Sequence, residues 1–448
     1  MTSRPRTWRS AAGAWLGIGT APGTLVLGAQ VGGRHGGALP VVVLVAGGAV
    51  MAALLAAQGR FGLVPPAGEN AGLAELTQRY LPPLADRATT ALLAVAMIGW
   101  FGFNVGLGGG AIAALAGVPD PVGAAVLAVP LVAVLITGGG RWNAVAVGTT
   151  LTAIALIGIV AVKLAPSTAP VSLTRGGTPG VLAADLAGYI GYVSVFAVRA
   201  PDFTIGLRGR RDLAACVALL VGPALAASIV GVGVAAASGS TDVVAVLSGP
   251  DGLPAANLFV AAAVIAPTLA ALHSGVLALH RFLPPTKHHP TTTNTPAPDA
   301  AKPHRGTGRA HTTGPDTSAG EPRPVAAGTP AAGGARRRSE WVRGRVDGRQ
   351  ALAVLMISVP GAVLAALRVD RMMLDWLTLL AAALPALVPP MAAEAVRRRR
   401  GGAPRPVPTW VWAPGAVLAV GLTLAGYAAA APLGLGLSVV ATAVRWRP

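Results

Sequence analysis

Cysteine is almost absent from this chain: Cys216 is the only one among 448 residues. An intrachain disulfide is therefore impossible, and cysteine usage does not indicate a redox compartment. Charged residues make up only 12% of the chain and aromatic residues only 4%, whereas 53% are hydrophobic and the mean hydropathy is +0.62. This composition excludes an ordinary soluble domain. Because Ala, Gly and Val dominate, we expect closely packed membrane helices.

Motifs of hydrolytic enzymes and ATP-driven pumps are also missing. The sequence has no HExxH, CxxC, GxSxG or P-loop pattern, and no paired carboxylate motif in an apolar run. Zinc hydrolases, nucleophilic hydrolases and P-loop ATPases need these residues at these spacings. We therefore predict that the protein is not an enzyme, and that it has no catalytic residue, no metal and no cofactor other than a coupling ion, a proton or sodium.

Apolar runs recur along the whole chain, and each is long enough to cross a bilayer, which takes about 20 residues as a helix. They predict an all-α polytopic membrane protein with about twelve transmembrane helices. A cleaved signal peptide is not expected, because the first run lacks a clear cleavage site. The predicted spans are 11–31, 39–58, 89–116, 121–137, 143–164, 182–206, 213–236, 255–282, 350–367, 372–396, 409–427 and 429–444.

The excess of basic residues, 35 Lys and Arg against 17 Asp and Glu, indicates membrane topology rather than nucleic-acid binding. With the N-terminus inside, nearly all Lys and Arg fall in cytoplasmic segments, as the positive-inside rule requires. We therefore expect a multi-pass protein of the plasma membrane with both termini cytoplasmic, whose partner is the lipid bilayer and not nucleic acid. The predicted outer segments hold only Arg34, Lys163, Arg175, Arg368 and Arg371.

Residues 284–349 interrupt the membrane pattern. They are rich in Pro, Thr, Gly and Ala and predict a disordered, basic cytoplasmic linker, whose arginines can contact anionic lipids. Its four histidines are interpreted as part of a solvated loop rather than as metal ligands. The remaining predicted parts are an N-terminal cytoplasmic tail (1–10), a first five-helix repeat (11–167), a second repeat (182–283 with 350–396) and two additional C-terminal helices (409–446).

Two spans contain polar interruptions that lie five spans apart. The first span has GTAPGT at Gly19–Thr24, and the sixth has RAPD at Arg199–Asp202. Transporters built from two inverted five-helix repeats place broken helices at corresponding positions, with the substrate between them. The exposed backbone groups and helix ends of such a break can hold a polar ligand. The sequence therefore predicts a five-plus-five inverted-repeat transporter fold with broken helices 1 and 6.

The third span carries a candidate binding pair, Trp100 and Asn104, at i and i+4 on one helical face. An indole and a carboxamide can stack on a flat heteroaromatic ligand and hydrogen-bond its edge. The alternative is an interfacial tryptophan and an asparagine that bonds another helix. Gly102, Gly106 and Gly110 predict a close-packing stripe rather than a phosphate loop.

Polar side chains in two later spans, among them Asp202, Thr268, His273 and Ser274, are candidates for ion coupling. Arg199 and Asp202 can form an ion pair across one turn, which has either a structural or a coupling role. His273 and Ser274 lie at membrane depth in the eighth span. A histidine there can relay a proton or can be satisfied inside the bundle.

The sequence as a whole resembles the nucleobase:cation symporter-1 family, the cytosine, purine, allantoin and hydantoin permeases. The resemblance implies a twelve-span alternating-access transporter of the fold described above. The matching segments are AWLGIGTAPGTLVLGAQVG, GWFGFNVGLGGGAIA, FAVRAPDFTIGLRGRRD, HSGVLAL and PALVPPMAAEAVRRRRGG.

By this resemblance, Trp100 corresponds to the family's stacking tryptophan, and Asn104 corresponds to a glutamine that hydrogen-bonds the substrate ring. The aromatic residue of span six falls at Val193, so Phe196 is expected to substitute for it beside Tyr192. Arg199 stands where relatives often have Asn. Arg199, Thr20 and Gly23 complete the expected substrate site.

The sodium site of coupled relatives is poorly matched in span eight. Ala270 and Ala271 replace hydroxyl residues, so only Thr268 and Ser274 supply hydroxyls. Proton coupling, or a fixed Arg199 charge in place of the ion, is therefore expected. The predicted function is secondary transport of a nucleobase or related nitrogen heterocycle; the alternative is a non-transporting membrane sensor or scaffold.

Overall fold

The computed structural model describes residues 5–35, 37–137, 142–164, 178–250, 252–283 and 348–446. Contacts divide the chain into two units, of which residues 284–347 form one by themselves. The predicted linker therefore lies outside the described residues, apart from Gly348 and Arg349. These two residues begin a helix instead of ending the linker, so the linker boundary was placed two residues too late.

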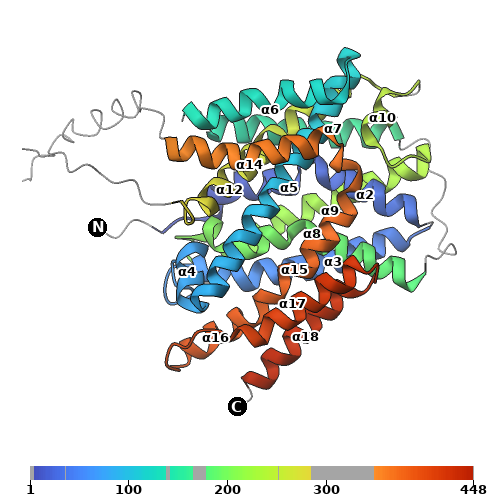
Figure 1. The fold of residues 1–448 in the computed structure, drawn as a ribbon. Coiled ribbons are helices and arrows are strands. Elements are labelled where there is room, and N and C mark those ends of the chain that lie inside the picture. The colour runs from blue at the N-terminus through green and yellow to red at the C-terminus, as the bar shows by residue number, and fades with distance from the viewer. Residues whose placement is uncertain are drawn as a thin grey trace, which may run out of the picture. The chain divides into compact units, whose positions relative to one another are not determined.

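The described part of the chain is helical, and its strand-like pairing is limited to one β-bridge between Arg6 and Leu207 (Figure 1). Short 3-10 turns, η1 (Arg60–Gly62), η5 (Val369–Met372) and η6 (Pro385–Leu387), join some of the helices. The helices are α1 (Trp8–Gly19), α2 (Pro22–Arg34), α3 (Leu39–Gly59), α4 (Leu73–Tyr80), α5 (Pro83–Ala116), α6 (Asp120–Thr137), α7 (Trp142–Leu164), α8 (Pro179–Thr204), α9 (Arg210–Ser238), α10 (Val243–Ser248), α11 (Ala256–Ala263), α12 (Ile265–Leu279), α14 (Gly348–Ala366), α15 (Met373–Ala383), α16 (Val388–Arg399), α17 (Thr409–Leu424) and α18 (Ala430–Arg445).

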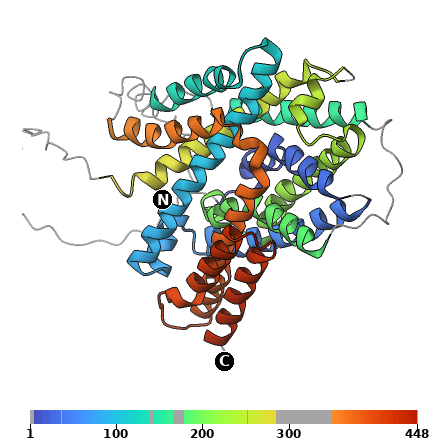
Figure 2. The same ribbon diagram turned by 45° about the vertical axis from the view of Figure 1, so that its right-hand side comes forward.

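The helices account for the predicted spans. Within the described residues, nine helices or helix runs are long and apolar enough to cross a membrane. Two further apolar helices, α17 and α18, are shorter and lie side by side in both views (Figures 1 and 2). The first span is divided into α1 and α2, so neither half reaches the length of a span by itself. Taken together, these elements are those of a multi-pass membrane protein.

The first helix of each predicted repeat packs on the second helix of the other repeat. Helix 1, through α2, packs closely on α9, the seventh span, while α8, the sixth span, packs on α3, the second span. A pseudo-two-fold relation between two repeats produces this reciprocal pairing. The α2–α9 contact is close because glycines face it: a Cβ on Gly28 would overlap the Ser228 carbonyl, and one on Gly231 would overlap the Leu25 carbonyl.

The predicted glycine stripe on α5 is confirmed as a close-packing surface. A Cβ on Gly102 would meet Gly361 and Leu364 of α14 at 2.8 Å. Farther along the same face, Gly106 and Gly110 leave room for the side chains of Asp370 and Arg368. The small residues therefore let one helix cross α5 and let an ion-pair network lie against it.

The sixth span, α8, was expected to be broken like the first span, and it is not broken. α8 runs without interruption from Pro179 to Thr204, with Pro201 inside its last turn. Pro201 lacks the N–H that would bond the Ala197 carbonyl, but the helix continues through it to Thr204. The irregular backbone therefore follows the RAPD segment, at Ile205–Gly209, instead of lying within it.

Two other spans are interrupted where a continuous helix was expected. The eighth span divides at Val264 into α11 and α12, and the tenth passes through η6 between α15 and α16. Pro267 cannot donate a backbone hydrogen bond to Ala263, which explains the division at Val264. Pro267 therefore does more than kink its helix.

Candidate functional site

The break in helix 1 is built around Pro22. Pro22 lacks the N–H that would bond the Ile18 carbonyl in a continuous helix, and the chain leaves helical geometry at Ala21 (φ −56°, ψ 140°). The Tyr192 hydroxyl of α8 donates to this Ile18 oxygen at 3.1 Å. The GTAPGT break predicted from the sequence is therefore confirmed, and helix 6 supplies a hydrogen bond to it.

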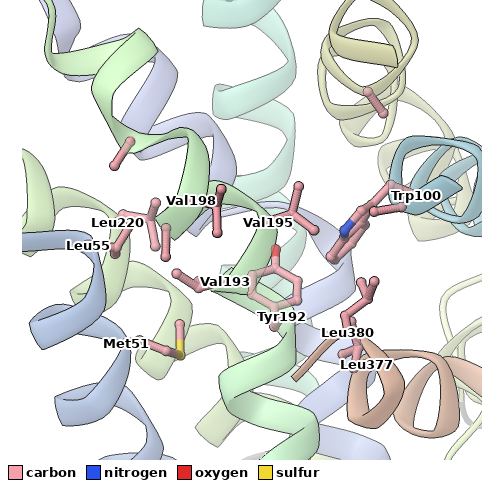
Figure 3. Close-up of a cluster of buried hydrophobic side chains, with 14 of the residues drawn as sticks. Met51, Leu55, Trp100, Tyr192, Val193, Val195, Val198, Leu220, Leu377 and Leu380 are labelled. Atoms are coloured by element: carbon pink, nitrogen blue, oxygen red, sulfur yellow. The ribbon is translucent and has the colours of Figure 1, made fainter. Parts of the chain in front are cut away.

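Tyr192 also belongs to a cluster of aromatic rings that joins α5 to α8. The Trp100 ring centroid lies 5.3 Å from that of Tyr192 and 6.1 Å from that of Phe196. Phe103, on the next turn of α5, packs edge-on against Trp100 at 5.7 Å. Figure 3 shows the Trp100 indole directed toward Tyr192, with Leu377 and Leu380 of α15 beside them. We call Trp100, Phe103, Tyr192 and Phe196 the ring cluster.

The Trp100 side chain has an unused hydrogen-bond donor. Trp100 is only 5% exposed, and its Nε1 is buried without a hydrogen-bond partner among the described residues. The neighbouring Asn104 does not pair with it, because its amide nitrogen donates to the Trp100 carbonyl at 2.8 Å. A buried donor left unpaired costs about 1–3 kcal/mol. An acceptor placed against Nε1 would remove this cost.

Gly23 lies against the ring cluster, whereas the hydroxyl of Thr20 bonds its own helix. A Cβ on Gly23 would lie 2.9 Å from the Phe103 ring, so the start of α2 is held directly against the rings. The Thr20 hydroxyl instead donates to the Leu16 carbonyl of its own helix at 2.9 Å. The structure thus brings Gly23 to the rings together with Trp100 and Phe196, while the Thr20 hydroxyl is engaged elsewhere.

Arg199 and Asp202 form the predicted ion pair, with 3.2 Å between Arg199 Nε and Asp202 Oδ2. The other Asp202 oxygen accepts a 2.7 Å bond from the backbone N–H of Leu73, the first residue of α4. Asp202 therefore acts as an N-terminal cap supplied from another helix. The Arg199 guanidinium lies 6.0 Å from the Phe203 ring centroid. The bond between Asp202 and Leu73 ties α8 to α4.

The coupling candidates of the eighth span, all on α12, are not gathered at one point. The buried Thr268 hydroxyl donates to the Val264 carbonyl at 2.5 Å. His273 is exposed and lies within electrostatic range of Arg199. Ser274 is half-buried beside it in the chain. In the described ranges, no group of three or more His, Cys, Asp or Glu side chains is placed to hold a metal ion.

Ion pairs close the end of the bundle that carries α10. Arg368 pairs with Asp120 at 2.8 Å and with Asp370 at 2.9 Å, and Arg371 pairs with Asp242, the cap of α10, at 3.2 Å. Burial opposes the charge of Arg368, but its bonds to Asp370 and Asp120 raise its pKa overall. We call this the α10 end.

The opposite end, which carries α4, is tied in a different way. The Arg398 guanidinium lies 3.9 Å from the Tyr80 ring centroid, and Arg281 pairs with Asp86 at 2.9 Å. Burial and the bond of its hydroxyl to Glu69 raise the pKa of Tyr80. We call this the α4 end. Polar contacts therefore fasten both ends of the bundle that holds the ring cluster.

The fold and the apolar helices together define a multi-pass membrane protein with the five-plus-five inverted-repeat transporter fold. No family model and no curated protein matches the sequence. The solved structures do contain similar folds, among them the fold of a nucleobase-cation-symport-1 family transporter, and the likeness is one of fold.

Three solved structures, two of one transporter and one of another, illustrate the likeness. The inward-facing conformation of Mhp1 has a TM-score of 0.65 and 14% identity over 99% of this chain and 93% of its own. A closed conformation of Mhp1, a nucleobase-cation-symport-1 family transporter with bromovinylhydantoin bound, has a TM-score of 0.62 and 15% identity over the same shares. A mutant manganese transporter of Eremococcus coleocola has a TM-score of 0.52 and 11% identity over 97% of this chain and 94% of its own.

From the sequence, Trp100 is a candidate binding residue and the first span is broken, but Tyr192 has no predicted role of its own. Tyr192 was noted only as a neighbour of Val193, the position of the family's aromatic residue. Val193 is fully buried in the core, and Tyr192 instead makes the ring contact. The signal that could have found it is the aromatic residue itself, one position away in an otherwise aliphatic run.

Proposed function

We propose that the protein is a secondary active transporter that moves a nucleobase or related nitrogen heterocycle, such as cytosine, a purine or a hydantoin, across the cell membrane by alternating access. The observation that carries the proposal is the buried, unpaired Trp100 Nε1, within a ring cluster that contacts the break in helix 1. A flat heterocycle supplies both a face for stacking and an acceptor for this donor.

The side chains of the ring cluster suit this role in different ways. Phe196 is only partly buried, so its ring is the one that can turn aside to expose the Trp100 face. A ligand stacked there gains about 0.5–1.5 kcal/mol from an aromatic contact beyond its burial. The Asn104 carboxamide oxygen, one turn away, is available to accept from a ring N–H because only its nitrogen is engaged.

Tyr192 can transmit the presence of a ligand to helix 1. Its ring contacts Trp100 and its hydroxyl bonds the Ile18 carbonyl, so moving the ring changes the contact at the helix break. A ligand shifts a conformational equilibrium only through such differential contacts. This is the link by which substrate binding would favour one arrangement of helices 1 and 6.

We place the α4 end in the cytoplasm, together with both termini, on the charge distribution of the sequence. The division into repeats of 11–167 and 182–283 with 350–396, two added helices at 409–446 and a tail at 1–10 belongs to the same proposal, and the reciprocal packing of α2 on α9 and of α3 on α8 supports it. A cation or a proton would drive transport, as the family name of Mhp1 suggests for that protein.

Uptake by cells that lack their own permeases tests the proposal. Labelled cytosine, a purine and a hydantoin are supplied, and at least one should be taken up saturably. Trp100→Ala should abolish that uptake, whereas Trp410→Ala, which removes an indole that is 54% exposed on α17, should leave it intact. Surface expression of both variants is the control. Normal transport by Trp100→Ala would refute the stacking role, and no uptake of any heterocycle would favour a sensor or scaffold.

A further inference from the structure

The buried carboxylate of Glu394, near the end of α16, gathers donors from three segments at the α4 end. Glu394 is only 1% exposed. Its Oε2 accepts from Arg397 Nε at 2.8 Å, and its Oε1 accepts from Arg398 Nε at 2.9 Å. The backbone N–H of Arg405 donates to Oε1 at 3.0 Å, and Trp446 Nε1, just beyond α18, donates to Oε2 at 3.4 Å. This carboxylate therefore holds together the end of α16, the loop that follows it and the end of α18.

The loop between α16 and α17 is fixed by further hydrogen bonds. Arg398 Nη2 donates to the carbonyl of Arg405 at 3.0 Å and to that of Arg79, in α4, at 3.1 Å. The Val407 N–H donates to the Tyr80 carbonyl at 2.6 Å. The loop backbone is therefore attached both to α16 and to the end of α4, so its side chains extend from fixed positions.

Four arginines around Glu394 have no carboxylate partner among the described residues. They follow the two arginines bonded to Glu394, belong to the fixed loop, or precede Trp446 in the chain. All but the last are exposed, and the last is half-buried, with its guanidinium 5.7 Å from the Trp446 ring centroid. We call these four residues the arginine surface: Arg399, Arg400, Arg405 and Arg445.

The acidic side chains near the arginine surface are already engaged. Glu394 accepts from the two arginines described above, while Glu69 and Glu75 both pair with Arg79 of α4. The arginine surface therefore carries an excess of positive charge. Each guanidinium presents a planar fork of N–H donors that matches the oxygens of a phosphate group.

The arginine surface lies where two apolar helices end. α16 closes an apolar run, Val369–Arg399, that is long enough to cross a membrane, and the apolar α18 ends at Arg445. Figure 1 shows α16 and the C-terminal end of α18 at the same edge of the bundle. Basic residues directly beyond membrane helices lie at the level of the lipid headgroups.

We propose that the arginine surface binds the headgroup phosphate of an anionic phospholipid. Val440 and Val444, one turn apart on α18, are 60% and 52% exposed and offer an apolar contact for the acyl chains. A zwitterionic headgroup also carries a cation, which the excess positive charge repels. The site is separate from the lipid contact expected of the linker, because all four arginines lie outside residues 284–349.

Native mass spectrometry of the purified full-length protein in a neutral detergent tests this inference, with phosphatidylglycerol as the probe. No transport substrate is added, so the outcome is separate from that of the transport proposal. The unmodified protein should bind phosphatidylglycerol more tightly than phosphatidylcholine. R399Q/R400Q should bind it about thirtyfold more weakly, because each basic side chain near an anionic lipid contributes about fivefold. Neither arginine bonds Glu394, so the variant keeps the bonds that fix the loop.

The matched control is R60Q/R87Q. Arg60 and Arg87 are also exposed arginines at the α4 end, but neither belongs to the arginine surface, so their loss should leave the affinity for phosphatidylglycerol unchanged. Equal losses in the two double variants would show that binding follows net charge alone and would overturn the site, as would unchanged binding by R399Q/R400Q. An excess of inorganic phosphate should not displace the lipid, because it lacks acyl chains; complete displacement would indicate a site for the free anion instead.

Discussion

Helix 1 and helix 6 open the two repeats, and each carries a proline beside a polar interruption, yet only helix 1 is broken. At Pro22 the Ile18 carbonyl, which proline cannot bond, accepts from the Ala21 N–H and from the hydroxyl of Tyr192, a residue of another helix. Pro201 stands in the last turn of α8, which continues to Thr204. A proline therefore begins a new helix in the first span and lies within a continuous helix in the sixth.

The largest effect is expected on the helix 1 side of this comparison, from Gly23→Leu. Its Cβ alone would lie 2.9 Å from the Phe103 ring, so the side chain would force apart the ring cluster at the break. Overpacking of this kind costs about 1–3 kcal/mol, and uptake should be lost. In the matched variant Gly13→Leu, nothing lies within 4 Å of the added Cβ, and uptake should persist. If both variants changed uptake equally, the contact between Gly23 and the rings at the helix break would not be needed for transport.

Tyr192→Phe tests the hydrogen bond that helix 6 donates to helix 1. The variant keeps the ring contact with Trp100 but leaves the Ile18 carbonyl without its side-chain donor. Loss of such a bond costs about 0.5–1.5 kcal/mol, so the apparent Tm of the purified protein should fall. Tyr427→Phe alters a tyrosine that is 64% exposed and serves as the control. An unchanged Tm in Tyr192→Phe would show that the bond does not stabilise the break.

Asp202→Ala addresses the other end of helix 6. It removes both the ion pair with Arg199 and the acceptor for the Leu73 N–H. Loss of a helix cap costs about 1 kcal/mol, so amide exchange in α4 should accelerate about fivefold, as measured by hydrogen-exchange mass spectrometry. Asp202→Asn can still accept from Leu73 but loses the ion pair, and should show a smaller acceleration. Equal exchange in all three proteins would contradict the capping role.

Pro201→Ala should have the smallest effect of the series. Because α8 is already continuous through this position, restoring one backbone N–H should leave the path of the helix unchanged. Uptake measured in cells should stay near that of the unmodified protein. A large loss of uptake would show that Pro201 has a role at the RAPD segment that the continuous helix does not reveal.

Much of the fold followed from the sequence because its signals are local. Apolar runs predict spans, a proline between glycines predicts the break in helix 1, and small residues four apart predict close helix packing. The Arg199–Asp202 pair was also predictable, since its members are one turn apart. Each of these depends on residues close together in the chain.

The features that escaped prediction depend on partners that are distant in the chain. The carbonyl that Tyr192 bonds lies on another helix, and so does the carboxylate that Trp446 contacts. Likewise, Asp202 caps a helix whose start is more than a hundred residues away. The interruption at Val264 was missed for another reason, because a proline in an apolar run predicts a kink and a break equally well.

The central claim is that Trp100, at the ring contact between α5 and α8, binds a flat nitrogen heterocycle. Thermal-shift measurements on the purified protein test it most directly, with cytosine, a purine and a hydantoin, each with and without sodium and at two values of pH. At least one compound should raise the apparent Tm, the shift should depend on pH more than on sodium, and Trp100→Ala should abolish it. A shift that survives in Trp100→Ala would contradict the claim.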